Sequence, residues 1–255
     1  MAINEAEYLK AFVTAGKHLQ ACMDANAAGG FRWLKAKPSK PAFADLVFAS
    51  GQRVYAVILV GMSSQKKLND DQTSCTFEIP KEQRLLLLAE CERYNLEPLA
   101  FPLWLGIMQP LMTGWNLFSL KENLRLITPG EPQNDSEPLA AMSEWELSNF
   151  RISLVMKDIE ELKLPIHSYQ DIPEIFPNIW FDNEEGRRSW VAVIPAEHAH
   201  DNSLPEQVKD IHRKLAPEFD GYLARVGVRN ATQPEEPPVR GGDLHVYYRG
   251  LEKLP

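Results

Sequence analysis

Cysteine is scarce in this sequence. Its 255 residues include three cysteines, Cys22, Cys75 and Cys91. An odd number of widely spaced cysteines supports neither a disulfide framework nor a tetrahedral zinc site. We therefore expect reduced, partly buried thiols.

Long apolar runs are also missing. The longest, Val54–Met62 and Leu99–Met108, fall well short of the roughly 20 residues that span a bilayer. The first residues, MAINEAE, carry acids where a secretory signal peptide carries bases. The expectation is a cytoplasmic protein with no membrane partner.

The motifs of several common enzyme classes are absent. The chain has no Gly-X-Ser-X-Gly, no P-loop and no Gly-X-Gly-X-X-Gly opening a helix, which argues against common hydrolases, NTPases and dinucleotide-binding enzymes. What is present is a globular composition, with 44% apolar and 24% charged residues. The length suffices for one large domain or two ordinary ones.

Charge is divided unevenly along the chain. Residues 1–125 hold 14 Lys/Arg and 12 Asp/Glu, a net of +2, whereas residues 126–255 hold 13 and 23, a net of −10. The second half is therefore a poor candidate for contacting phosphate and a better one for a basic partner. In the first half, a local basic patch is conceivable from four residues: Arg32, Lys35, Lys37 and Lys40.

Apolar periodicity predicts the same order of elements twice: helix, strand, hairpin, helix, strand, strand. In the first half these are helix 2–25, strand 31–36, hairpin strands 44–49 and 53–60, helix 81–94 with Leu85–Leu88 buried, and strands 98–105 and 115–120. In the second half they are helix 144–162, for which 150–156 competes as a strand, then strand 165–169, hairpin strands 178–182 and 189–194, helix 205–215, and strands 221–228 and 244–248.

The segment TPGEPQNDSE, residues 128–137, is rich in Pro, Gly and acids, as linkers are. We therefore expect an α/β (α+β) chain of two tandem units, each a mixed sheet flanked by helices. The predicted boundaries are 1–126 for the first domain, 127–143 for the linker and 144–255 for the second domain.

The hairpins carry a resemblance to a known family. Two hairpin sequences in the chain match each other. The first consists of Phe43-Ala44-Asp45-Leu46-Val47-Phe48 and Val54-Tyr55-Ala56-Val57-Ile58. The second consists of Phe176-Pro177-Asn178-Ile179-Trp180-Phe181 and Trp190-Val191-Ala192-Val193-Ile194. A hairpin opened by Asp, then a helix and a strand, resembles the PD-(D/E)XK nucleases, which include restriction endonucleases and Holliday-junction resolvases. The resemblance implies two restriction-endonuclease-like units.

That family holds Mg²⁺ with the Asp of the first hairpin strand and the acid of an acid-X-Lys on the second, and the metal activates water. Carried over, the Asp position is Asp45 in the first unit, with Gln83 in the following helix matching a Gln or basic residue of some relatives. The acid and Lys positions fall on Ala56 and Ile58. In the second unit the three positions are Asn178, Ala192 and Ile194.

One position of three thus survives in the first unit and none in the second. The expectation is a binding or assembly protein that lacks catalysis and a cofactor, with a protein as its partner. Two alternatives remain open: a nucleic-acid-binding module using the first domain, and a nuclease with migrated ligands, in which Asp45 with Glu5, Glu7 or Gln83 holds Mg²⁺. His198-Ala199-His200 could bind a metal with a third ligand, but it follows a strand end and is interpreted as an exposed loop.

Overall fold

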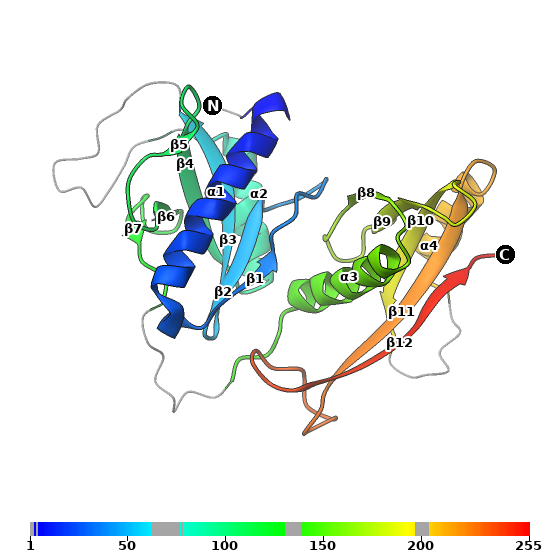
Figure 1. Cartoon of the computed structure of the whole chain (residues 1–255). Coiled ribbons are helices and arrows are strands. Elements are labelled where there is room, and N and C mark those ends of the chain that lie inside the picture. Colours follow the sequence, from blue (N-terminus) through cyan, green and yellow to red (C-terminus); the bar gives the residue numbers. More distant parts are fainter. Residues whose placement is uncertain (1–2, 4, 63–76, 78, 131–138, 197–203) are drawn as a thin grey trace. The chain divides into compact units, whose positions relative to one another are not determined.

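The computed structural model describes residues 3, 5–62, 77, 79–130, 139–196 and 204–255. The chain divides into two compact units, unit 1 comprising Met1–Pro38 and Phe43–Pro138, and unit 2 comprising Ser39–Ala42 and Leu139–Pro255. The division between Pro138 and Leu139 lies inside the segment expected as a linker. The predicted α+β class with two tandem sheet-based units is confirmed (Figure 1).

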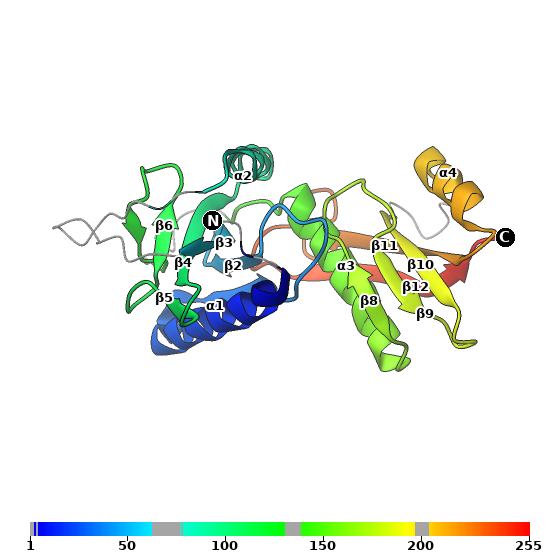
Figure 2. The same ribbon diagram turned by 90° about the horizontal axis from the view of Figure 1, so that it is seen from above.

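Unit 1 is a mixed sheet with a helix on each face (Figure 2). Its helices are α1 (Glu5–Ala25), the short 3₁₀ helix η1 (Ala27–Gly29) and α2 (Lys81–Arg93). Its strands are β1 (Phe31–Lys35), β2 (Leu46–Ser50), β3 (Arg53–Met62), β4 (Glu97–Trp104), β5 (Gln109–Pro110), β6 (Leu117–Ser119) and β7 (Leu126–Ile127).

Helix α1 covers one face of this sheet. Phe12, Ala15 and Leu19 recur at helical spacing and are buried, so they form the apolar stripe that the sequence predicts. After α1 and η1, Gly30 adopts φ = +60°, a left-handed conformation that glycine enters without a steric penalty. The chain can therefore turn directly into β1.

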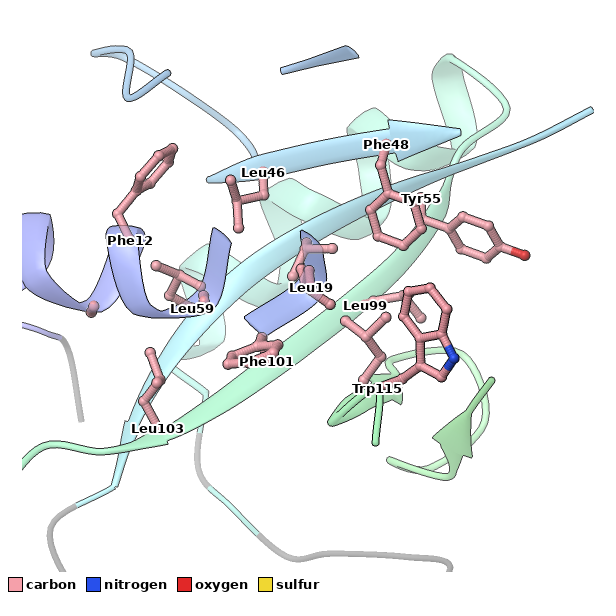
Figure 3. Close-up of a cluster of buried hydrophobic side chains, with 14 of the residues drawn as sticks. Phe12, Leu19, Leu46, Phe48, Tyr55, Leu59, Leu99, Phe101, Leu103 and Trp115 are labelled. Atoms are coloured by element: carbon pink, nitrogen blue, oxygen red, sulfur yellow. The ribbon is translucent and has the colours of Figure 1, made fainter. Parts of the chain in front are cut away.

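The core of unit 1 lies between α1 and the sheet (Figure 3). Side chains alternate between the two faces of a strand, so Tyr55, Val57 and Leu59 of β3 all point toward α1. Ala56 and Ile58 consequently point to the other face, on the α2 side, and both are buried.

Helix α2 corrects one expectation. Leu87 is fully buried, but Leu85 and Leu86 keep 55% and 49% of their surface exposed. Consecutive helical residues are about 100° apart around the axis, so four leucines in a row cannot all face one sheet.

Unit 2 is a five-stranded sheet with two helices among the residues that the structure describes. The helices are α3 (Glu144–Glu161) and α4 (Glu206–Leu215). The strands are β8 (Ile166–Tyr169), β9 (Ile179–Asp182), β10 (Arg188–Pro195), β11 (Asp220–Asn230) and β12 (Leu244–Lys253).

The helical prediction for 144–162 is confirmed, and the competing strand over 150–156 is wrong. Ser143 and Glu146 form a reciprocal capping box, which satisfies backbone N–H groups that a helix start leaves open. Along α3, Ile152, Val155 and Ile159 are buried at three- to four-residue spacing and pack against the sheet. β-Branched side chains such as these also favour strands, but here their burial along one face of a helix stabilises the helix.

The two sheets share one topology. Five strands of the seven-stranded sheet of unit 1, in the order β1-β2-β3-β4-β6, match the path β8-β9-β10-β11-β12 of unit 2, and β5 and β7 are additional strands of unit 1. In both sheets, the first three strands of the path pair antiparallel with their neighbours. The third and fourth strands are parallel, and the second helix of the unit connects them. The fifth strand pairs antiparallel with the fourth. α1 and α3 pack on matching faces of the two sheets, against Val57 and Val191 respectively.

Even an irregularity recurs. The β1–β2 pairing skips Leu34, between the pairs Trp33↔Phe48 and Lys35↔Val47. The β8–β9 pairing skips His167, between the pairs Ile166↔Phe181 and Ser168↔Trp180. A bulge at the same place in both sheets supports the interpretation that the units are two copies of one fold, because bulges are fixed features of a strand pair.

Candidate functional site

Asp45, which the sequence comparison placed at the expected Asp position, immediately precedes β2. Its carboxylate accepts two hydrogen bonds, one from the backbone N–H of Leu59 at 2.7 Å and one from the Tyr8 hydroxyl at 2.8 Å. Its own N–H donates to the Val57 carbonyl at 2.9 Å. If β2 extended further toward its N-terminal end, a backbone carbonyl of β2 would accept the Leu59 N–H of β3, and the Asp45 carboxylate takes the place of that carbonyl.

Burial governs the charge of this group. Loss of solvent raises the pKa of Asp45 above its ordinary value, although the hydrogen bonds from Leu59 and Tyr8 and the charge of Lys35 act in the opposite direction. Asp45 is thus a half-buried acid with a raised pKa, held by partners within its own unit.

Asn178 makes the same connection in unit 2. Its amide oxygen accepts from the backbone N–H of Val193 at 2.7 Å, and its own N–H donates to the Val191 carbonyl at 2.9 Å. Its side-chain NH₂ donates to the Ile175 carbonyl at 3.1 Å. Asn178 is therefore the structural counterpart of Asp45, and we call the two residues the ladder caps.

The ladder caps also correct the alignment of the two hairpins. They match Val57 with Val191 and Leu59 with Val193, so Ala192 corresponds to Ile58 rather than to Ala56. The sequence suggests the other alignment because both strands contain Ala-Val-Ile. The displacement is two residues, so matched residues still lie on the same face of the sheet in either alignment.

Neither alignment restores acid-X-Lys. The side chains at all four expected positions are hydrocarbon and are almost fully buried: Ala56, Ile58, Ala192 and Ile194. Ala192 and Ile194 belong to the apolar cluster that packs under α4 with Val208. These positions contribute to the two cores.

The residues beside Asp45 do not fit the Mg²⁺ that the family resemblance implies. Magnesium requires a near-octahedral set of oxygen ligands, and in the described part of the chain no three acidic, histidine or cysteine side chains gather as a metal would require. Gln83 lies half-buried in the first turn of α2. The side chain of Glu5, like His198 and His200, lies outside what the structure describes.

The four candidate phosphate-binding residues do not share one environment. Arg32 and Lys37 are exposed in unit 1, whereas Lys35 is 3% exposed and its ammonium donates to the Ala44 carbonyl at 2.8 Å. Lys40 is exposed and belongs to the short segment assigned to unit 2. Lys35 thus stabilises the approach to β2 instead of contributing to a surface patch.

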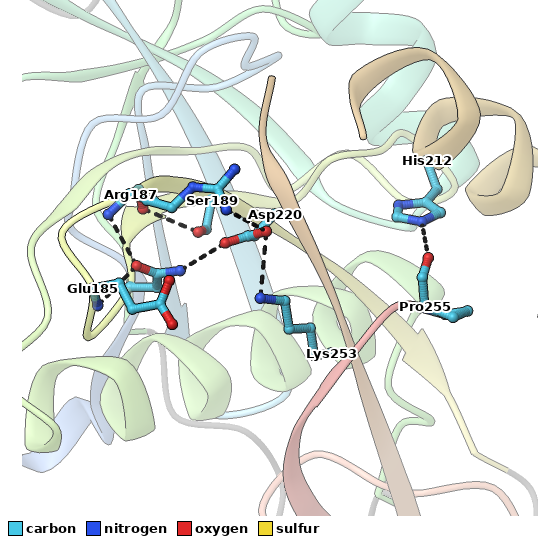
Figure 4. Close-up of polar contacts among 8 residues, drawn as sticks. Glu185, Arg187, Ser189, His212, Asp220, Lys253 and Pro255 are labelled. Carbon is cyan, nitrogen blue, oxygen red and sulfur yellow. Dashed lines mark hydrogen bonds and ion pairs between the residues drawn. The ribbon is translucent and has the colours of Figure 1, made fainter. Parts of the chain in front are cut away.

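A polar cluster in unit 2 has no counterpart in the sequence predictions. The Asp220 carboxylate, at the start of β11, accepts from the Asn183 amide at 2.9 Å and forms ion pairs with Arg187 at 3.5 Å and Lys253 at 3.4 Å (Figure 4). These residues come from three separate strands or turns. No local motif could have revealed them, because only the sheet brings them together.

Comparison with known proteins gives one match. A family profile described as a domain of unknown function (DUF8840) matches residues 145–254, which is most of unit 2 and less than half of the chain. No curated protein and no solved structure matches the chain. In the described residues, no helix is both long and apolar enough to cross a membrane.

Proposed function

We propose that this chain is a non-catalytic binding or assembly protein built on two copies of a PD-(D/E)XK-like unit. The observation that carries the proposal is that both ladder caps accept hydrogen bonds from the backbone of the neighbouring strand. The one acid at a metal-binding position, Asp45, bonds to Leu59 and Tyr8, and its equivalent in unit 2 is the neutral Asn178.

The topology supports the nuclease-like part of this proposal. Each unit has the helix–three strands–helix–strand order on which the resemblance rests, with the Asp or Asn position opening the hairpin. Fold and function separate readily, so such a scaffold can be retained for its surfaces after its chemistry is lost.

The charge distribution indicates the kind of partner. Residues 126–255 carry a net charge of −10, which favours association with a basic surface through long-range steering. We therefore propose a protein partner with such a surface, in the cytoplasm.

Calorimetric titration with Mg²⁺ and Mn²⁺ tests the absence of a metal centre. The matched variant is Asp45→Asn, because asparagine keeps an acceptor for the Leu59 N–H, as Asn178 does for Val193, while removing the charge. We expect no binding at millimolar metal in either protein. Stoichiometric binding that Asp45→Asn abolishes, with metal-dependent cleavage of DNA or RNA, would overturn the proposal.

Nucleic-acid binding through unit 1 is the second candidate, favoured by the exposed Arg32 and Lys37. It requires affinity for labelled DNA or RNA that falls steeply with salt. Anisotropy measurements at low salt, with an Arg32→Glu/Lys37→Glu variant, decide it. Binding that the double substitution removes would favour this candidate over a protein partner.

A further inference from the structure

Unit 2 contains a pocket of about 480 Å³ on the α3 side of its sheet. This volume lies within the range of pockets that bind small molecules. The end of α3, the β9–β10 turn and strands β11 and β12 enclose it. It is separate from the ladder cap Asn178, which does not line it.

The floor of the pocket is apolar and aromatic. Phe181, which is buried, meets Tyr222 edge to face with ring centroids 5.5 Å apart. Leu164 and Leu251 complete this surface. The Tyr222 hydroxyl has no hydrogen-bond partner within the described part of the chain, so it can bond to a ligand.

The rim contains charges of both signs, and both of its cations have a contact within the unit. Lys253 pairs with Asp220 at 3.4 Å, and the Arg249 guanidinium lies over the Tyr247 ring, 5.3 Å from its centroid. By contrast, the carboxylates of Glu184 and Glu185 are exposed and make no ion pair with any described residue. The charged residues that line the pocket are three acids, Asp158, Glu184 and Glu185, and two bases, Arg249 and Lys253, so the lining has a net charge of −1.

Helix α3 strengthens this negative potential. Its last turn contains no basic residue, and Lys157, just before that turn, pairs with Glu161 at 3.6 Å, so the partial negative charge of the helix C-terminus adds to that of the acids. Asp158, one turn before the end, accepts a hydrogen bond from Tyr248 at 2.8 Å through one oxygen and lines the pocket.

The acidic turn is held in place before any ligand arrives. The Asn183 side-chain oxygen accepts from the backbone N–H groups of Glu185 at 3.0 Å and Arg187 at 2.9 Å, and its NH₂ donates to Asp220. Figure 4 shows Asp220 between Arg187 and Lys253 at this turn. The backbone of the turn is thus ordered in advance, and binding has only to order the exposed side chains of Glu184 and Glu185.

From this combination, we propose that the pocket binds an arginine or lysine side chain of a partner polypeptide. The methylene stem would pack on Phe181, Tyr222 and Leu251, and the cationic head would meet Glu184, Glu185 and Asp158. A cation over an aromatic floor gains further stabilisation. Assigning the ligand to a polypeptide rests on the proposed function.

The test is a titration of the full chain, followed by ¹⁵N–¹H NMR, with the peptide Ac-Ala-Arg-Ala-NH₂. The matched ligand replaces arginine by citrulline, its neutral isostere. The matched variants are Glu184→Gln/Glu185→Gln in the pocket and Glu235→Gln/Glu236→Gln, an exposed pair of the same unit that does not line it.

We expect shifts at the amides of Glu185 and Gly250, and affinity that falls as salt rises. The citrulline peptide and the Glu184→Gln/Glu185→Gln variant should each bind at least about fivefold more weakly, and the other variant should bind normally. Equal binding of the two peptides, or no binding, would overturn the inference.

Agmatine, the free amine with the same head group, tests the source of the ligand. If agmatine binds and the arginine peptide does not, the pocket takes small amines and the polypeptide assignment is wrong. None of these outcomes depends on Asp45 in unit 1, so the pocket inference and the absence of a metal centre can fail independently.

Discussion

Arg240 and Glu146 form a bidentate ion pair in the interior of unit 2, with N–O distances of 3.0 and 2.8 Å and side chains only 3% and 1% exposed. The same carboxylate accepts from the Ser143 N–H at 2.8 Å and so completes the cap of α3. The pair thereby ties the loop before β12 to the start of α3.

Removing one partner should be costly, because it leaves the other charge buried and unpaired. We expect Arg240→Met to lower the free energy of unfolding of unit 2 by about 3–5 kcal/mol. Urea denaturation followed by circular dichroism measures it. Arg125→Met is the control, since Arg125 pairs with Glu122 in solvent, and it should cost no more than about 0.5 kcal/mol. Equal effects would contradict this assignment.

The ladder caps predict a ranked series of stabilities. Asp45→Ala leaves the Leu59 N–H and the Tyr8 hydroxyl without their acceptor and should cost about 2–3 kcal/mol. Asp45→Asn keeps an acceptor and should cost under about 1 kcal/mol. The reverse exchange, Asn178→Asp, places a carboxylate against the Ile175 carbonyl at a site 2% exposed and should cost about 2–3 kcal/mol. Chemical denaturation of the three variants tests the order.

Stability should depend on pH through Asp45. Because burial raises the pKa of Asp45 in the folded state, the folded protein binds more protons than the unfolded chain between the unfolded value, about 3.9, and the raised one. In that window, the contribution of Asp45 to stability decreases as pH rises. The stability of Asp45→Asn relative to the native protein should therefore increase with pH, and a flat difference from pH 4 to 8 would refute the assignment.

The cysteines should differ in reactivity. Burial raises the pKa of Cys91 to about 12, and its side chain is 1% exposed. Cys22 lies on the partly exposed side of α1. In a Cys75→Ser background, we expect a disulfide reagent to modify Cys22 in the native protein and Cys91 only at the rate of unfolding. Rapid modification of both would show that the α2 side of the sheet opens readily.

Much of the fold is predictable from the sequence because apolar periodicity is strong in both halves. The predicted hairpin strands 53–60 and 189–194 correspond to β3 and β10, whose burial on both faces gives near-continuous apolar runs. Where periodicity is ambiguous, as at 150–156, tertiary packing decides, and there it favours the helix.

The candidate site is harder to predict from the sequence than the fold. The alignment of Ala56 with Ala192 fails because the number of residues in a hairpin turn cannot be read from strand patterns alone. The buried Lys35 ammonium donates to the backbone carbonyl of Ala44, and such a contact has no sequence signature. The unit 2 pocket combines residues more than 90 positions apart, such as Asp158 and Lys253.

The ladder caps show why an aspartate at the start of such a hairpin is weak evidence for a nuclease when genome sequences are searched for enzymes. A strand that extends past its neighbour leaves a backbone N–H that needs an acceptor, and either Asp45 or Asn178 meets that need. The needs of folding alone can therefore keep an aspartate or an asparagine at this place in a chain that has no acid-X-Lys. In this architecture, an isolated aspartate is explained by the hydrogen bond that it accepts and is not by itself evidence of a metal site.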